Sequence, residues 1–184
     1  MILLCDDFPE EVTVNGRGYR IYTDFRDWIR FCIMLLDDSL EQDDKLIAAL
    51  QWYESELPES IPDAIEALRL FMVHSFSSGD KENDRSDSTK PLISYTVDAP
   101  FILSDFLCYY SINLKTIDYM HWWHFRALLI GLPEDSSIKK RISYRAVDLS
   151  EIENDKERDR IRKIKQSIAL PSICEDIDIA AAFE

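Results

Sequence analysis

A run of fourteen residues without an apolar side chain divides this sequence into two halves. The run extends from Ser77 to Lys90 and reads SSGDKENDRSDSTK. Because it has no apolar surface to bury, packing cannot offset the entropy that would be lost on ordering it. We therefore predict four parts: an N-terminal lobe at 1–76, a flexible polar linker at 77–90, a C-terminal helical lobe at 91–171 and an acidic, alanine-rich tail at 172–184.

Apolar residues before the linker recur at spacings of three and four, which is the pattern of helices with one buried face. The first predicted helix spans about 24 to 36. Ser39 and Gln42 resemble a capping box that starts a second helix. The buried face of that helix is predicted to contain Leu46, Ile47, Leu50 and Tyr53. Ser60 is expected to cap a third helix, because Pro62 is tolerated in a first turn.

Four more helices are predicted after the linker. Their starts are marked by Asp98, Thr116, Ser136 and Ser150. The helix that follows Asp98 is apolar on almost every side, so we expect it to be buried. Ser150 and Glu153 form a second candidate capping box, at the start of a charged final helix.

A β-hairpin is predicted near the N-terminus. Val12 and Val14 alternate with polar residues, and Asn15-Gly16 follows them. Both turn residues tolerate the positive φ of a tight hairpin turn. The predicted fold class is therefore mainly α: about seven helices in two lobes, with a small N-terminal β-hairpin.

Net charge, apolar run lengths and cysteine spacing indicate the cellular compartment of the protein and the classes of partner it can bind. The 184 residues carry a formal net charge of -14, which argues against nucleic acid as a partner. No apolar run reaches the roughly 18 residues of a membrane-spanning helix, and no signal peptide is recognised, so we expect no membrane partner and a cytoplasmic protein. The four cysteines are far apart in sequence, as expected of free thiols. Residues 139–165 are locally basic, which fits either a solvated helix face or a positive surface.

Residues that could carry chemistry have simpler structural explanations. His121 and His124 are three apart on one predicted helix, but no carboxylate pattern completes a metal site. Cys108 lies among apolar residues, where burial would make a thiol inert. The paired acids near helix starts are more typical of caps than of magnesium ligands, and no glycine-rich phosphate loop is present. We therefore predict no catalytic, cofactor-binding or metal-binding residues, no cofactor, and no enzyme.

The adjacent tryptophans Trp122 and Trp123 are the most distinctive feature of the second half. Neighbouring helical positions point about 100° apart, so one indole could enter the core while the other contacts a partner. Burial of both in one domain is the alternative. Aromatic anchors dominate many protein interfaces. The predicted partner-binding residues are Trp122, Trp123, Phe125, Tyr119, Tyr109, Tyr110 and Trp28.

Three blocks of the sequence are similar to one known family. The first contains Val12-Thr13-Val14-Asn15-Gly16 and Thr23-Asp24-Phe25-Arg26-Asp27-Trp28-Ile29-Arg30-Phe31. The second is Asp118-Tyr119-Met120-His121-Trp122-Trp123, followed by Phe125, Ala127-Leu128-Leu129 and Gly131-Leu132-Pro133-Glu134-Asp135. The third contains Tyr144-Arg145 and the charged stretch 155–171. Together they resemble the bacteriophage gene-product-fifteen family over about residues 8 to 171.

The resemblance implies a tail-morphogenesis protein of phages or prophages of Gram-positive bacteria, encoded between the tail tube and tape measure genes. Proteins at that position are usually tail assembly chaperones, which keep the tape measure protein soluble in the host cytoplasm. The implied partners are the tape measure protein, the tail tube protein, or both, and self-association into a homo-oligomer is a further option. The alternative function is a structural component that is retained in the mature tail.

Overall fold

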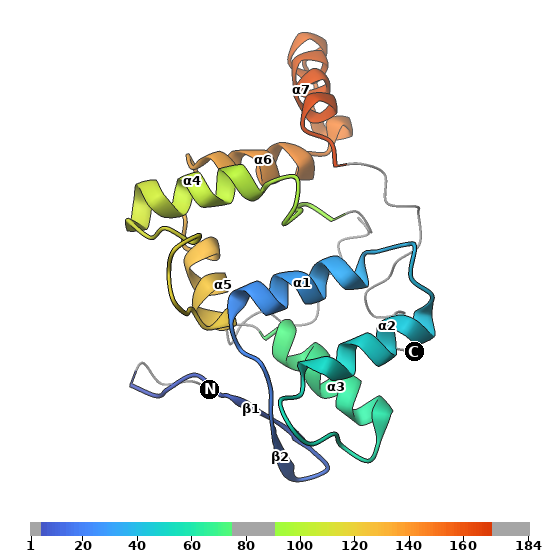
Figure 1. The fold of residues 1–184 in the computed structure, drawn as a ribbon. Coiled ribbons are helices and arrows are strands. Elements are labelled where there is room, and N and C mark those ends of the chain that lie inside the picture. Colours follow the sequence, from blue (N-terminus) through green and yellow to red (C-terminus); the bar gives the residue numbers. More distant parts are fainter. Residues whose placement is uncertain (1–4, 75–90, 171–184) are drawn as a thin grey trace. The chain divides into compact units, whose positions relative to one another are not determined.

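The computed structural model describes residues 5–74 and 91–170, which form seven α-helices, two short 3₁₀ helices and one β-hairpin (Figure 1). The elements, in chain order, are β1 Glu11–Val14, β2 Arg17–Arg20, α1 Phe25–Leu35, α2 Gln42–Ala49, η1 Leu50–Trp52, α3 Ile61–Met72, α4 Ala99–Tyr110, α5 Trp122–Ile130, α6 Ser137–Ala146, η2 Leu149–Glu151 and α7 Asp155–Ser167. The predicted fold class is confirmed. In the described part of the chain, no helix combines the length and the apolar composition needed to span a membrane.

The described chain divides into two compact units. Unit 1 contains residues 5–74 and 118–127, and unit 2 contains residues 91–117 and 128–170. The sequence predicted that 118–127 would belong to the second lobe, whereas its contacts group it with unit 1. The predicted linker at 77–90 and the predicted tail at 172–184 lie outside the described residues.

The hairpin of unit 1 has the predicted turn. β1 and β2 are antiparallel, and Val14 is paired with Arg17, so Asn15 and Gly16 alone form the loop. Both have positive φ, 50° and 81°, as a primed two-residue turn requires. Helix α3 packs against β1 and covers the apolar face of this hairpin.

Helix α1 begins and buries its face much as predicted. The side chain of Asp24 accepts a hydrogen bond from the backbone N–H of Arg26, which caps the first turn. The buried residues are Phe25, Trp28, Phe31 and Leu35. Their spacings of three and four place them on one side of the helix, toward the core of unit 1.

Helix α2 differs from its prediction in start and in buried face. Its N-cap is Glu41, and the hydroxyl of Ser39 donates instead to Asp37. Ile47, predicted to be buried, is 65% exposed, while Lys45 is buried and donates to the carbonyl of Leu35. The buried ammonium satisfies a carbonyl that the end of α1 leaves unpaired. Of the four residues predicted to be buried, only Ile47 is exposed, whereas Leu46 and Leu50 are half-buried and Tyr53 is buried.

The predicted helix start at Thr116 was wrong, because α5 begins only at Trp122. The residues just before Trp122 are extended and pair with the segment that enters α1. The backbone N–H of Phe25 donates to the carbonyl of Met120 at 2.9 Å, and that of Trp122 donates to the carbonyl of Thr23 at 2.7 Å. This pairing across the chain outweighs the local helical pattern.

Unit 2 is organised around α4 and α6. Helix α6 begins where predicted, with the hydroxyl of Ser136 accepting from the backbone of Lys139. Asp105 of α4 adds a second cap, because its carboxylate accepts from the backbone N–H groups of Ser137 and Ile138. A carboxylate at a helix N-terminus also interacts favourably with the helix dipole.

Other expectations for unit 2 were wrong. Helix α4 is not buried all round, since Leu107 is 54% exposed and Cys108 is exposed as well. Helix α7 begins after Asn154, which caps it, and Ser150 lies in η2 instead of at the start of α7.

Candidate partner-binding site

The two adjacent tryptophans are both buried in unit 1. Trp122 is 2% exposed and Trp123 is 6% exposed. Met72 and Phe71 are the last residues of α3. The indole N–H of Trp122 donates to the carbonyl of Met72 at 3.1 Å, and that of Trp123 donates to the carbonyl of Phe71 at 2.8 Å. Both indoles therefore donate to carbonyls at the end of a helix, where backbone acceptors lack partners within the helix.

Aromatic rings from three helices surround this pair. Trp28 of α1 lies 4.9 Å from Phe71 and 6.2 Å from Trp122, and Phe25 is stacked on Phe125 at 4.9 Å, measured between ring centroids. Such offset rings add to the stability gained from burial alone. This aromatic cluster is the core of unit 1.

Arg126 joins the cluster although the sequence did not single it out. Its guanidinium donates to the carbonyls of Met72 and His74, at 2.8 and 2.7 Å, and lies 5.8 Å from the ring centre of Trp122. Its position four residues after Trp122 on a helix was the available signal, because residues at that spacing share a face. Arg126 thus helps to hold the end of α3.

His121 acts as a helix cap and a packing residue. Its Nδ1 accepts from the backbone N–H of Trp123 at 3.0 Å, and its Nε2 lies 3.1 Å from the carbonyl oxygen of Pro9. The ring is stacked on Phe8 at 4.9 Å. Burial lowers the pKa of His121, which favours the neutral ring with a proton on Nε2. No group of three potential metal ligands occurs within the part of the chain that is described.

The seven predicted partner-binding residues do not form one surface. Trp28, Trp122, Trp123 and Phe125 are core residues of unit 1. Tyr119 is 53% exposed in unit 1, where its hydroxyl is hydrogen-bonded to Thr23. In unit 2, Tyr109 is 44% exposed, and Tyr110 is partly buried and donates to the carbonyl of Leu128.

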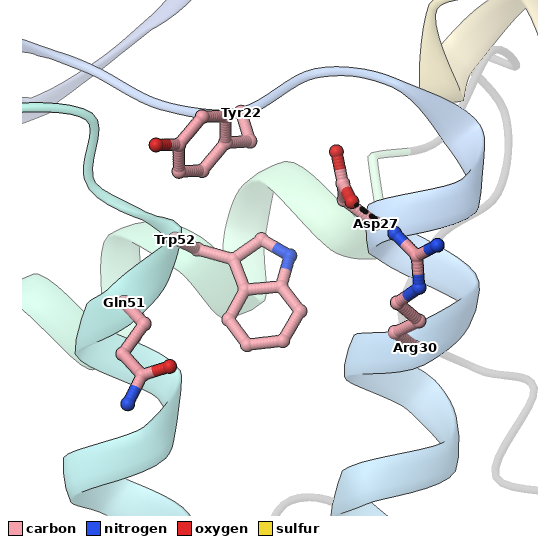
Figure 2. A pocket seen from close by; sticks show the side chains of 5 residues that line it. All are labelled: Tyr22, Asp27, Arg30, Gln51 and Trp52. Atoms are coloured by element: carbon pink, nitrogen blue, oxygen red, sulfur yellow. Dashed lines mark hydrogen bonds and ion pairs between the residues drawn. The ribbon is translucent and has the colours of Figure 1, made fainter.

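A surface hollow in unit 1 was missed by the sequence analysis. Figure 2 shows its five lining residues: Tyr22, Asp27, Arg30, Gln51 and Trp52. The aromatic rings of Tyr22 and Trp52 form two of its sides, and Asp27 and Arg30 make an ion pair of 2.7 Å on α1. No local sequence motif marks this hollow, because its lining residues come from three separate segments of the chain.

Trp52 is the unusual member of this hollow. Its ring packs edge-on against the buried Phe31, with ring centres 4.8 Å apart. Its indole Nε1 is buried, yet it has no hydrogen-bond partner among the described residues. A buried donor without a partner costs about 1–3 kcal/mol, so native proteins seldom retain one without a reason. The hollow therefore combines exposed aromatic surface with an unused donor, as a partner-binding site does.

The comparisons with known proteins place this architecture in one family. No curated protein and no solved structure matches the chain. The family model described as Bacteriophage Gp15 protein matches residues 4–170, a range that includes the hairpin, the aromatic cluster and nearly all of unit 2. The chain therefore belongs to the bacteriophage Gp15 protein family.

Proposed function

We propose that this phage protein is a non-enzymatic tail assembly chaperone that binds the tape measure protein and aids assembly of the tail tube. The observation that carries the proposal is exposed apolar surface on a strongly acidic family member. Tyr22, Ile47, Leu107 and Tyr109 are between 44% and 65% exposed, while the chain has a net charge of -14. Exposed apolar groups can bind an apolar client, and a high net charge keeps such a protein soluble.

A helical client fits the same surface chemistry. Amphipathic helices bind in grooves through apolar residues at spacings of three, four and seven. The aromatic hollow at Tyr22 and Trp52 offers a place for one such side chain. The family is a bacteriophage family, and the tape measure protein, which the sequence resemblance implies as a partner, is the helical client that we propose.

Co-expression tests this proposal. The tape measure protein is produced with and without this chain in the bacterial host cytoplasm, and its soluble fraction is measured. We expect a soluble complex that is isolated through a tag on either protein. Unchanged solubility together with no complex would overturn the proposal.

Mature virions give a second test. A chaperone leaves the assembled tail, so mass spectrometry of purified particles should not detect the chain. Detection at a fixed ratio to the tube protein would instead identify a structural component of the tail.

A further inference from the structure

We propose that the hollow beside Trp52 is the docking site for a basic, apolar-faced helix of a partner protein. The Trp52 surface is defined here as Tyr22, Asp27, Arg30, Ile47, Gln51 and Trp52. Only the identity of the natural partner, the tape measure protein, rests on the proposed function. The site and the chemistry of its occupant rest on the structure of unit 1.

The size of the hollow favours a side chain as its occupant. Its volume is about 210 Å³, whereas sites for small molecules and cofactors usually measure about 300–1,000 Å³. Tyr22, which is 46% exposed, and Trp52 form apolar sides, and the buried ring of Phe31 packs edge-on against Trp52. A hollow of this size and lining suits one large apolar side chain.

Apolar surface continues from the hollow along α2. Ile47 of α2 precedes Gln51 of η1 by four residues, and η1 continues directly from α2, so the two lie about one turn apart. Ile47 is the most exposed large apolar residue of the described chain, at 65%. The eight residues of α2 extend about 12 Å at 1.5 Å per residue. A partner helix therefore meets this strip over about two turns, with one anchor in the hollow and one on Ile47.

The indole nitrogen of Trp52 adds a polar contact. Figure 2 shows it on the side of the ring that faces Asp27 and Arg30. The side chain of Arg30 is 69% exposed and can turn toward solvent. An acceptor of the partner, such as a carbonyl or hydroxyl oxygen, then reaches the Nε1 donor, which has no partner within the described residues.

The charge beside this surface selects a basic partner. The connection from α1 to α2 and the first turn of α2 carry five exposed carboxylates and no basic residue: Asp37, Asp38, Glu41, Asp43 and Asp44. Asp43 and Asp44 precede Ile47 by one turn, so they flank the apolar strip directly. Lys45, the first base after them, is buried and bound to the carbonyl of Leu35. Acidic groups at the rim of an interface attract basic groups and oppose acidic ones.

A second copy of this chain fits the surface less well. The basic helix α7 is the matching element within the protein, but its apolar residues Ile161, Ile164 and Ile168 are already partly covered in unit 2. Docking α7 would remove those contacts. A helix of a separate protein whose apolar face is exposed to solvent would lose no such packing contacts on binding.

The test uses the full chain and a synthetic probe. The probe is an eighteen-residue helical peptide with leucine at positions i, i+3, i+4 and i+7 and lysine elsewhere, and its glutamate analogue is the charge control. The variants are Ile47→Lys and Trp52→Phe, with Leu70→Lys as the matched control, since Leu70 is 54% exposed on α3 of the same unit. Circular dichroism verifies that each variant is folded.

We expect the lysine peptide to bind and the glutamate peptide not to bind. Ile47→Lys should weaken binding at least about tenfold, the usual effect of losing a hot-spot contact. Trp52→Phe, which keeps the ring but removes the donor, should weaken it about fivefold, and Leu70→Lys less than about twofold. Equal weakening by Ile47→Lys and Leu70→Lys would mean that net charge alone binds the peptide, and the inference would fall.

Two further measurements separate this inference from the proposed function. If the wild-type chain solubilises the tape measure protein and Ile47→Lys does so equally well, the docking site is refuted while the chaperone function stands. If the peptide binds as expected but the tape measure protein does not bind the wild-type chain, the function is refuted while the site stands. Oligomers that Ile47→Lys dissociates in sedimentation would identify a second copy as the occupant and overturn the proposed partner.

Discussion

Replacement of Asp98 by asparagine tests the charged centre of unit 2. The Asp98 side chain is fully buried. Its carboxylate accepts from Nε of Arg141 at 2.9 Å and from Nη1 and Nη2 of Arg145 at 2.6 and 2.8 Å. The backbone N–H of Ser94 donates to it at 3.0 Å. One carboxylate thus joins the start of α4 to two turns of α6.

The expected loss follows from what the substitution leaves behind. Asp98→Asn retains the shape but removes the negative charge between two guanidinium groups, and the Arg145 side chain is only 6% exposed. Breaking a buried ion pair by removing one partner costs about 3–5 kcal/mol. Arg145 keeps hydrogen bonds to the carbonyls of Leu92 and Ile168. We therefore expect the lower end, a decrease of about 3 kcal/mol in the free energy of unfolding of unit 2.

Hydrogen exchange measures this decrease where it occurs. All four tryptophans lie in unit 1, so tryptophan fluorescence follows unit 1, while amide exchange in α4 and α6 follows unit 2. Exchange of those amides should accelerate about 100-fold or more in Asp98→Asn. A change below about 1 kcal/mol would refute the assigned role of the buried charge cluster.

The same cluster should make unit 2 sensitive to acid. Burial alone would raise the pKa of Asp98, but hydrogen bonds from Arg145, Ser94 and Arg141 outweigh burial and hold the pKa below its ordinary 3.8. Its stabilising contribution is therefore complete above about pH 4 and is lost as the pH falls through the folded-state pKa. Asp98→Asn should lack this loss, as urea titrations over the acid range would measure.

Three further predictions concern unit 1. Trp122→Ala and Trp123→Ala should each lower its free energy of unfolding by about 3–5 kcal/mol in urea titrations; lost binding in an equally stable variant would contradict their core positions. Because burial lowers the pKa of His121 below 6.5, the unfolded chain takes up a proton first on acidification, so unit 1 should lose stability as the pH falls through 6.5 toward the lower folded-state pKa. His121→Asn should lose less, as fluorescence-monitored urea titrations measure. Burial raises the pKa of Cys32 to about 12, so iodoacetamide should modify the exposed Cys108 and leave Cys32 intact until unfolding; peptide mass spectrometry showing rapid native-state modification of Cys32 would contradict this.

Local sequence signals predicted the elements that depend on local contacts. The Asn15-Gly16 turn has the expected positive φ at both residues, and Ser136 caps α6 as predicted. The two capping boxes at Ser39 and Ser150 were wrong for one shared reason. Each hydroxyl donates to an aspartate two residues earlier, at 2.6 and 2.8 Å, and this local turn competes with capping.

Contacts between distant residues could not be predicted from periodicity. The segment before Trp122 continues the helical apolar pattern, yet it pairs with Thr23 and Phe25, almost a hundred residues earlier. The sequence indicates that Trp122 and Trp123 are important, but their membership of unit 1 instead of unit 2 depends on that long-range pairing. The hollow at Trp52 was missed because it combines residues from three separate segments, none with a distinctive motif.

Unit 1 is completed by a segment that follows part of unit 2 in the chain. Trp122, Trp123 and Arg126 supply the donors for the end of α3. During synthesis, Trp28 and Phe71 therefore emerge from the ribosome before the residues that cover them. A nascent chain that ends before residue 118 leaves part of this aromatic core open to water. At the ribosome, the first half of this protein therefore has no finished core until residues 118–127 arrive.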